Sequence, residues 1–597
     1  MSSRPRLAAR SRRPMARKPR PRQRSRRYSP RFRALLVWSL LILSIIGLGS
    51  RLAYIQLVQG TALAQMAQQQ QQRRRQPIQA RHSIVDRQGN ALAVDQIEYT
   101  LYAHPALFDQ SASAIAAQLS SLLEQPTRQL VQQFEAQETG IKVAETLPEE
   151  ISKRILELEL NGLELIPNLQ RFYPRGDLFA QIVGYVDVDG EGQAGLEYSL
   201  QEQLFLPQPS QAQSAQTGRQ QDLALAALLA EDGLMLQLTL DSRLQRAAQL
   251  SLRRQMETYG AKRGAVLVMD AHSGAILAMA VEPTYDPNRY YEADVAAFKN
   301  WAVSDSYEPG STFKPVNVAI ALASQVIDPS FSIYDEGRIQ IGEWPIQNAD
   351  YAARGGRGPL SLAEVLKYSS NVGMVHIMEA LAPETYFDWL QRLEIDQPTG
   401  IELPAETTGQ LKEKEQFVGS RIEPATTAFG QGFALTPVQL LRLQGTLANG
   451  GKLVTPHVVS GLRDRQGQIH WQPPRPQPQP LFDAATAQQV VSMMETVVQE
   501  GTGEPAQVPG YRIAGKTGTA QKALNGYYTD ARITSFVGIL PVEDPRYVIL
   551  AIVDEPWGDD AYGSTVAAPI VKAVTESLVA VEGIPPSSLS PETEAAE

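Results

Sequence analysis

The segment from Ala34 to Gly49, ALLVWSLLILSIIGLG, constrains this chain most, because sixteen successive residues carry no charge. With the apolar RLAYIQLV that follows, it is long enough to cross a bilayer as one helix of roughly 17 to 25 residues. Fourteen Arg and Lys residues, and no acidic residue, occupy positions 1–33. We therefore predict a basic cytoplasmic tail over 1–33, a transmembrane anchor over 34–54, and everything after it outside the cytoplasm.

A cleaved signal peptide is the alternative for this N-terminus, because Ala62-Leu63-Ala64 resembles a cleavage site. That site lies well beyond the apolar segment, with Arg51 and several polar residues between them, so we favour a retained anchor. Outside the tail there are 41 of the 55 basic residues and all 64 acidic ones, so the rest of the chain is acidic. An acidic body with a basic tail beside an apolar segment argues against a nucleic-acid-binding protein.

Cysteine and histidine, the usual ligands of zinc and other transition metals, are few: the chain has no cysteine and six histidines. The absence of cysteine excludes disulfides, thiol nucleophiles and thiolate zinc sites. The histidines are scattered, with no pair at a spacing such as HExxH. We therefore predict no metal and no cofactor.

The chain after the anchor divides into segments with different patterns of apolar, polar and turn residues. ARHSIVDRQGNALAVD predicts two short strands around the turn Arg87–Asn90. Residues 111–159 have helical spacing, and residues 171–205 mix turn signals with one apolar strand. The Gln-, Ser- and Pro-rich stretch at 206–230 is predicted to be flexible.

A second folded region begins with a strand from Leu234 to Leu240, after which Asp241 can cap a helix. Two apolar hairpins, one starting at Gly264 and one at Ser535, enclose mostly helical and loop sequence. This order predicts an α+β fold, in which a sheet built from distant parts of the chain is flanked by helices. The last residues, 582–597, are predicted to be a disordered tail.

The first of three short motifs is the S-x-x-K formed by Ser311 and Lys314, directly after Pro309-Gly310. Residues three apart share one helix face, so the lysine amine can reach the serine hydroxyl. A lysine surrounded by apolar residues or other cations can lose its proton near neutral pH and act as a base. Alone, the motif is weak, since most such sequences are ordinary helix starts.

The second motif is the S-x-N formed by Ser369 and Asn371. A capping box of Ser361 and Glu364 predicts a helix just before it, and a further helix is predicted from about Val372. The tight connection would hold a hydroxyl that can relay a proton and a carboxamide that can bind a substrate amide. A plain capping turn is the alternative.

The third motif is Lys516-Thr517-Gly518-Thr519, which follows an apolar strand. Its glycine leaves backbone uncovered, so a peptide could add to that edge while the cation and hydroxyls hold a carboxylate. With Gly510 the segment also matches the phosphate-binding pattern G-x-x-x-x-G-K-T. That loop should precede a helix, whereas here the sequence continues as turn and strand.

The combination of the three motifs decides between these alternatives. Their order, with separations of about 55 and then about 145 residues, is the one found in penicillin-binding proteins and serine β-lactamases. The chain resembles the class B penicillin-binding proteins, and within them the septal peptidoglycan D,D-transpeptidases. The segments that carry the resemblance include DRQGNALA, RFYPRGDLFAQIVGYVD, WAVSDSYEPGSTFKP, LKYSSNVGM, MMETVVQEGTG and AGKTGTAQK.

The resemblance implies a domain organisation and an activity. After the anchor it implies an elongated α/β pedestal domain of the dimerisation type over 55–233. A transpeptidase domain with a five-stranded antiparallel sheet flanked by helices follows over 234–581. The implied enzyme cross-links peptidoglycan stem peptides through an acyl-serine, without a cofactor. Its implied partners are donor and acceptor stem peptides, β-lactams, a lipid-II-polymerising glycosyltransferase and other division proteins.

The first two motifs carry the chemistry that the resemblance implies. Ser311 would be acylated by a stem peptide that ends in D-Ala-D-Ala, and Lys314 would take its proton. Ser369 would pass a proton to the leaving D-alanine, and Asn371 would hold the donor amide.

The third motif would bind the substrate. Lys516, Thr517 and Thr519, with Gly518 between them, would hold the terminal carboxylate of the donor. The backbone N–H groups of Ser311 and Thr519 would form the oxyanion hole.

Other functions remain open from the sequence. Asn at position 371, where the elongation group has Asp, favours a septal over an elongation-specific transpeptidase. A D,D-carboxypeptidase or a β-lactamase shares all three motifs, but the anchor and the large pedestal argue against both. An inactive division scaffold or a β-lactam sensor is the non-enzymatic alternative. The resemblance places the protein in the bacterial cytoplasmic membrane, with its catalytic domain outside the cell.

Overall fold

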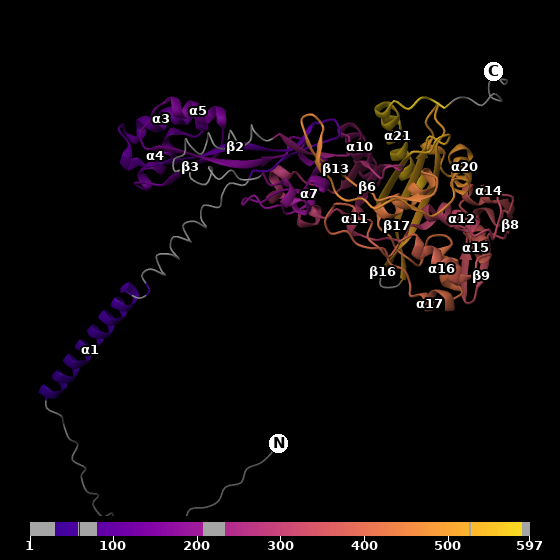
Figure 1. The fold of residues 1–597 in the computed structure, drawn as a ribbon, viewed down its shortest axis with the longest axis horizontal. Coiled ribbons are helices and arrows are strands. Elements are labelled where there is room, and N and C mark those ends of the chain that lie inside the picture. Colours follow the sequence, from indigo (N-terminus) through magenta and orange to yellow (C-terminus); the bar gives the residue numbers. More distant parts are fainter. Residues whose placement is uncertain (1–29, 58, 60–79, 207–232, 525–526, 588–597) are drawn as a thin grey trace, which may run out of the picture. The chain divides into compact units, whose positions relative to one another are not determined.

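The computed structural model describes residues 30–57, 59, 80–206, 233–524 and 527–587 (Figure 1). The basic tail up to residue 29, nearly all of the segment predicted to be flexible and the last ten residues lie outside this part. Two compact units are distinguished, residues 1–77 and residues 78–597.

In the first unit, helix α1 (Pro30–Leu57) contains the apolar segment. The window Val37–Tyr54 has a mean hydropathy of 1.6, and none of it is buried. A second helix that passes the same length and composition test, Gly563–Glu582, is half buried in the catalytic domain. Helix α1 is therefore the helix expected of a single-pass membrane anchor.

The pedestal is built around a long strand, β2, which pairs with three neighbours. The turn Arg87–Asn90 joins β1 to β2, as predicted. Strand β4 pairs with residues 94–103 of β2 and β3 with residues 98–103, and three helices pack beside them around a core of their own (Figure 1). The elements are β1 (Ser83–Val85), β2 (Ala91–Ala103), β3 (Ile141–Pro148), β4 (Leu163–Phe172), α3 (Ala112–Leu123), α4 (Thr127–Ala136) and α5 (Glu149–Glu157).

Two predictions for the pedestal are wrong in detail. The helical run expected over 111–159 is interrupted by strand β3, whose buried Val143 and Leu147 lie four residues apart and so imitate helical spacing. The structure describes all of residues 171–205, and after β4 ends at Phe172 this range contains no strand, where the sequence predicted one. Its apolar residues form short helical turns instead: η2 (Gly176–Phe179), α6 (Ala180–Val183), α7 (Gly195–Ser199) and α8 (Gln201–Leu204).

The pedestal sheet continues across the predicted domain boundary at residue 234. Strand β5 (Leu234–Leu238) runs parallel to β1, and β13 (Val459–Asp464) pairs with β5 on its other side. Strand β14 (Ile469–Trp471) completes a seven-stranded sheet. One hydrophobic core also includes residues from both domains. The pedestal and the catalytic domain therefore share a sheet and a core.

The catalytic domain contains the expected five-stranded antiparallel sheet, in the order β16-β17-β18-β6-β7. Both predicted hairpins are present, and β18 pairs with β6, so strands nearly 300 residues apart are neighbours, as in Ala551 beside Val266. The strands are β6 (Arg263–Asp270), β7 (Ile276–Glu282), β16 (Ala514–Leu524), β17 (Tyr527–Leu540) and β18 (Tyr547–Asp554).

Helices cover both faces of this sheet, because alternate residues of each strand point to opposite sides. Val266 and Val268 pack with α10 (Ser242–Tyr259) and α21 (Ala568–Glu582). Leu267 and Met269 pack on the other side, in the core that contains α12 (Lys314–Ala323), α19 (Pro437–Ala448) and most of α20 (Ala484–Glu500). As predicted, Asp241 caps α10 and accepts a hydrogen bond from the Arg243 N–H.

Smaller elements lie between α12 and α19 in the chain. They are β8 (Ser332–Asp335), β9 (Arg338–Ile341), β10 (Trp344–Gln347), β11 (Gly358–Ser361), α14 (Leu362–Lys367), α15 (Asn371–Glu379), α16 (Pro383–Arg392), α17 (Lys414–Gly419) and α18 (Ile422–Thr427). Strands β8 and β11 pair with each other, and β9 pairs with β10.

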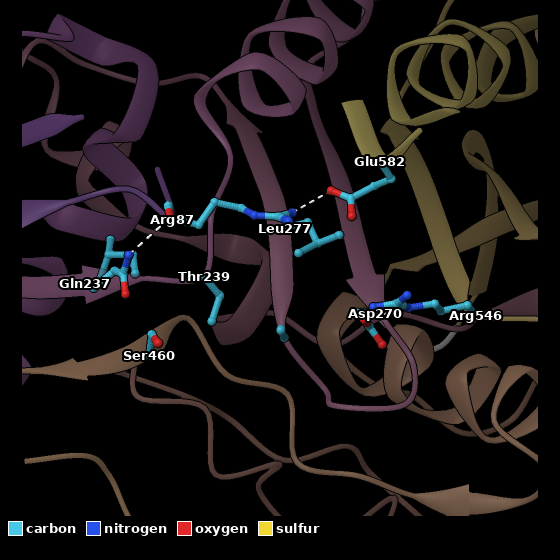
Figure 2. A pocket seen from close by; sticks show the side chains of 10 residues that line it. Arg87, Gln237, Thr239, Asp270, Leu277, Ser460, Arg546 and Glu582 are labelled. Carbon is cyan, nitrogen blue, oxygen red and sulfur yellow. Dashed lines mark hydrogen bonds and ion pairs between the residues drawn. The ribbon is translucent and has the colours of Figure 1, made fainter. Parts of the chain in front are cut away.

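A cavity of about 310 Å³ lies where pedestal strands meet the catalytic sheet (Figure 2). Its charged side chains form two ion pairs, Arg87 with Glu582 at 2.6 Å and Arg546 with Asp270 at 2.8 Å. Gln237 Nε2 donates to the backbone oxygen of Arg87 at 3.1 Å. Each of these charges therefore has a partner. The ion pair of Arg87 and Glu582, here called the charged clasp, links the β1–β2 turn to the end of α21.

Candidate active site

Ser311 lies in the 3₁₀ turn η6 (Gly310–Phe313), which leads directly into α12. Gly310 has φ +56° and donates its N–H to the oxygen of Gly430 at 2.9 Å, which fixes the start of the turn. The two residues after the serine are buried, whereas Ser311 itself is only partly buried. The helix start predicted here is present, and Ser311 remains partly accessible to solvent.

Lys314 is fully buried and joins the first motif to the second. Its Nζ donates to the Ser369 carbonyl oxygen at 2.6 Å, to Asn371 Oδ1 at 2.8 Å and to Ser369 Oγ at 3.3 Å. Within the described residues, no hydrogen bond joins this amine to Ser311. The spacing places both residues on one turn as predicted, but the amine is directed toward the S-x-N motif. Catalytic hydrogen bonds commonly tighten only when substrate binds.

The S-x-N motif forms the connection between α14 and α15. The capping box of Ser361 and Glu364 opens α14 as predicted. Ser369 then adopts a left-handed conformation with φ +57°, which is uncommon for a residue other than glycine. Ser370 caps α15 by accepting from the Gly373 N–H. The unusual backbone of Ser369 persists where its side chain is held between two lysines, as is typical of functional sites.

Lys516 reaches the same serine from the third motif. Its Nζ donates to Ser369 Oγ at 2.9 Å and to the Thr517 carbonyl oxygen at 2.9 Å. Thr517 Oγ1 in turn shares a hydrogen bond of 2.8 Å with Thr502 Oγ1. Sequence reasoning missed Thr502, although it belongs to the EGTG segment that carries part of the resemblance. The Ser369 hydroxyl is therefore the meeting point of the three motifs.

The glycine of the third motif has a packing role that the sequence interpretation did not anticipate. A Cβ on Gly518 would lie 2.3 Å from Ser535 Oγ and 3.0 Å from a methyl carbon of Thr312. Glycine at this position thus lets β16 lie against the turn that carries Ser311, instead of leaving backbone open to a ligand.

Strand β16 nevertheless offers a free edge, because in the described part of the chain its only strand partner is β17. Thr519 on this strand is exposed, and its hydroxyl accepts from the Gly563 N–H at 3.2 Å. An unpaired edge of this kind can accept an extended peptide as an added strand.

The electrostatics of the site are dominated by two buried cations. Burial lowers the pKa of Lys314 well below its usual value, and the charge of Lys516 lowers it further, while the carboxylate of Asp335 opposes the change. Burial lowers the pKa of Lys516 to about 7. Among the described residues, neither amine forms an ion pair with a carboxylate. An amine with such a pKa can accept a proton near neutral pH.

Metal ligation has no visible basis near this site. Within the described residues there is no group of three or more His, Asp or Glu side chains that could hold a metal ion. The donors that converge are hydroxyls, amines and one carboxamide. These groups suit proton transfer and the binding of an anionic, peptide-like substrate.

The fold and the site together define a class, the serine acyl-transfer enzymes. Residues 264–576 match the penicillin-binding protein transpeptidase domain, and residues 78–204 match the penicillin-binding protein dimerisation domain. The chain belongs to the class B penicillin-binding proteins and is a peptidoglycan D,D-transpeptidase.

Individual relatives agree with this family. The peptidoglycan D,D-transpeptidase FtsI homolog of Mesostigma viride is 40% identical over 93% of this chain and 96% of its own length. Stage V sporulation protein D of Bacillus subtilis is 32% identical over 92% and 86%. The structure of penicillin-binding protein 3 of Mycobacterium tuberculosis complexed with aztreonam matches with a TM-score of 0.66. Its sequence identity is 28%, over 86% of this chain and 98% of that one.

Proposed function

We propose that this transpeptidase acts through Ser311 as nucleophile, Lys314 as base and Ser369 as proton relay. The observation that carries the proposal is the position of Ser369 Oγ, which accepts from Lys314 at 3.3 Å and from Lys516 at 2.9 Å. In the first half-reaction, Ser311 Oγ bonds to the carbonyl carbon of the penultimate D-alanine and gives its proton to Lys314. The peptide C–N bond then breaks, and Ser369 relays the proton taken up by Lys314 to the nitrogen of the leaving D-alanine, so that Lys314 and Ser369 end the step as they began it.

The second half-reaction restores the enzyme. An amine of an acceptor stem peptide attacks the ester carbon, a new amide forms, and the Ser311 oxygen leaves and regains its proton. The product is a cross-link between two stem peptides. A β-lactam would acylate the same hydroxyl, a proposal supported by the aztreonam complex of the mycobacterial relative.

The donor would bind along β16. Lys516, Thr517 and Thr519 would hold its terminal carboxylate, and Asn371 would hold its amide. The N–H groups of Ser311 and Thr519 would stabilise the oxyanion. Close packing at Gly518 supports this arrangement, because it brings the turn of Ser311 against the strand.

The cellular role follows from the same family. We propose a single-pass protein of the bacterial cytoplasmic membrane, with residues 1–33 in the cytoplasm and the catalytic domain outside. Donor and acceptor peptides would come from strands made by a separate lipid-II-polymerising glycosyltransferase among the division proteins. A septal role is supported by the FtsI names of relatives and by Asn at position 371. The domain boundaries 55–233 and 234–581 are kept as functional divisions, although strands of one sheet lie on both sides.

The test is labelling of the full chain, in detergent, with a fluorescent penicillin, beside Ser311→Ala, Lys314→Ala and Ser306→Ala. Ser306 lies on the same loop and is partly buried, so it controls for loss of a nearby hydroxyl. We expect a stable label in the parent and in Ser306→Ala, and none in the other two. A label retained in Ser311→Ala would refute the assignment, and no label in a folded parent would favour a scaffold.

Label stability and acceptor use separate the related enzymes. Rapid release of the label would indicate a β-lactamase. With a pentapeptide donor and an amino acceptor, a transpeptidase forms the new amide, whereas a D,D-carboxypeptidase forms only the hydrolysed tetrapeptide. Depletion in cells should give filaments for a septal enzyme and rounded cells for an elongation-specific one.

A further inference from the structure

A buried carboxylate, Asp335, lies behind the S-x-N motif and has no role in the site described above. It ends strand β8 and is fully inaccessible to solvent. The backbone N–H of Gly337 donates to its Oδ1 at 2.7 Å. Gly337 has φ +77° in the turn toward β9, and the Asn348 N–H donates to its carbonyl oxygen at 2.9 Å. The turn thus ties Asp335 to the end of β10.

Asn348 connects this carboxylate to the catalytic motif. Its Nδ2 donates to both oxygens of Asp335, at 2.9 and 2.8 Å. Because an ionised carboxylate only accepts hydrogen bonds, these contacts fix which way the amide points. Its Oδ1 is thereby turned toward the motif, where it accepts from the Asn371 N–H at 2.8 Å and the Val372 N–H at 3.1 Å. It also accepts from Ser370 Oγ at 3.2 Å.

The atoms held by Asn348 are the first free N–H groups of α15, which a helix cannot satisfy internally. One belongs to Asn371, whose side chain is held as well. Asn371 Nδ2 donates to the Gln347 carbonyl oxygen at 3.0 Å, and Asn371 Oδ1 accepts from Lys314 Nζ at 2.8 Å. The lysine's hydrogen-bond acceptor is therefore held by Gln347 and Asn348 at the end of β10, and Asn348 is in turn held by Asp335.

Asp335 also contributes charge to the site. In the described part of the chain it contacts no cationic side chain, whereas the neighbouring Glu336 pairs with His376 at 3.0 Å nearer the surface. The charged groups that act on the Lys314 amine are Lys516 from β16 and Asp335 from β8. Removal of the Asp335 charge would therefore remove the carboxylate that favours the protonated form of Lys314.

We propose that Asp335 is a positioning residue for acyl transfer, which acts through Asn348 to orient Asn371 and the amine of Lys314. This inference rests on the proposed roles of Ser311 and Lys314. It assigns Asp335 and Asn348 to the supporting structure of the site and not to the groups that touch substrate.

The test compares Asp335→Asn with a matched control, Asp86→Asn. Asp86 is also fully buried, and it likewise accepts from an asparagine side chain (Asn90 Nδ2, 2.9 Å) and from turn N–H groups, but in the pedestal. In Asp335→Asn a donor would face a donor, so at least one hydrogen bond to Asn348 is lost. Both variants should lose thermal stability, and only Asp335→Asn should lose acylation rate per folded molecule.

The readout is acylation by a penicillin over a range of concentrations, in the full chain, corrected for folded protein. For Asp335→Asn we expect the maximal acylation rate constant to fall about tenfold to a hundredfold, as a displacement near 1 Å can cause. The apparent dissociation constant should change little. The rising limb of the rate against pH should move to lower pH, because loss of the carboxylate further destabilises protonated Lys314. A merely structural role would lower the folded fraction and leave the rate constant and the pH profile unchanged.

A second variant protects the test if Asp335→Asn does not fold. Asn348→Ala keeps Asp335 but removes the connection, and it should lower the acylation rate constant by a similar factor. The double variant should be no slower than the slower single variant, since both act through one chain of contacts. Unchanged rate constants in Asp335→Asn and Asn348→Ala, with Ser311 still acylated, would overturn this inference and leave the proposed function standing. A label retained in Ser311→Ala would instead overturn the proposed function.

Discussion

Two groups of buried charged residues in this molecule differ in whether each charge has a partner of opposite sign. The first, here called the junction cluster, consists of Arg81, Asp95, Arg171 and Glu197 in the pedestal. Glu197 accepts from Arg81 at 3.0 Å and from Arg171 at 2.7 Å, and Arg171 also pairs with Asp95 at 2.9 Å. Burial opposes the charge of Arg171, but the two carboxylates more than offset it and raise its pKa.

The second group is the pair of catalytic-site lysines, Lys314 and Lys516. Both are fully buried, and among the described residues neither contacts a carboxylate, although the charge of Asp335 acts on Lys314. Their pKa values fall instead of rising. The comparison teaches that a buried charge with a matched partner keeps its charge and is structural, whereas a buried cation without one loses its proton more easily and can take part in proton transfer.

The largest expected effect is at Lys314. In Lys314→Met the acylation rate should fall by about a thousandfold or more, since general-base catalysis contributes roughly 10² to 10⁴. The free energy of unfolding should stay the same or rise, because an apolar side chain of similar length replaces a buried amine. Stopped-flow acylation and urea denaturation measure the two quantities. Marked destabilisation of this variant would show that the lysine is structural and break the comparison.

The junction cluster should respond in the opposite way. Glu197→Gln leaves two buried guanidinium groups facing one carboxylate, so the free energy of unfolding should fall by about 3 to 5 kcal/mol. The acylation rate per folded molecule should hardly change, because the cluster has no contact with the active site among the described residues. Urea denaturation gives the first quantity and active-site titration the second. A variant that is stable but inactive would place the cluster in the catalytic machinery.

The lysine pair should also give acylation a distinctive pH dependence. The rate should rise with pH while Lys314 loses its proton, and fall when Lys516 loses the charge that holds the substrate carboxylate. Since the pKa of Lys516 is about 7, its protonated fraction should be roughly fivefold lower at pH 8 than at pH 7, and the falling limb of the second-order rate constant should follow that fraction.

The control for this profile is Lys516→Arg, whose guanidinium stays protonated over the whole range. In that variant the falling limb should disappear, whatever its absolute rate. Penicillin acylation measured from pH 5 to 9 supplies both profiles. A falling limb that survives in Lys516→Arg would assign it to another group.

The smallest effect is expected at the charged clasp, the ion pair of Arg87 and Glu582 beside the cavity. The pair of Arg87 and Glu582 is partly exposed, with the arginine side chain 34% accessible, so solvent screens much of its attraction. Arg87→Ala should lower the free energy of unfolding by less than about 1 kcal/mol. Arg87→Lys, which keeps the charge, is the matched control. A loss as large as that of Glu197→Gln would show that the clasp holds the two domains together.

The local structure around the motifs could be predicted from the sequence because it depends on local patterns. Ser311 and Lys314 fall on one turn by spacing alone, and the capping box of Ser361 and Glu364 fixes where α14 begins. The two hairpins of the catalytic sheet follow from apolar alternation and turn residues. Local backbone chemistry dictates these features wherever they lie in the fold.

Strand β3 and the helical turns near Phe179 could not be predicted in this way. In both, apolar residues are spaced ambiguously, and tertiary packing selects one conformation over the other. The shared sheet across residue 234 was hidden for a related reason, since β5 and β13 are far apart in the chain and pair only in the folded state.

The sequence by itself thus determined an N-terminal apolar helix, an α+β catalytic domain and three motifs whose residues are proposed to carry acyl transfer. Only the tertiary structure decided which of those residues meet. It brought Lys314 and Lys516 to the same hydroxyl of Ser369, and it linked Asp335 to Asn371 through Asn348. The physical reason is that burial, charge balance and the direction of a hydrogen bond depend on neighbours distant in sequence, which no local pattern records.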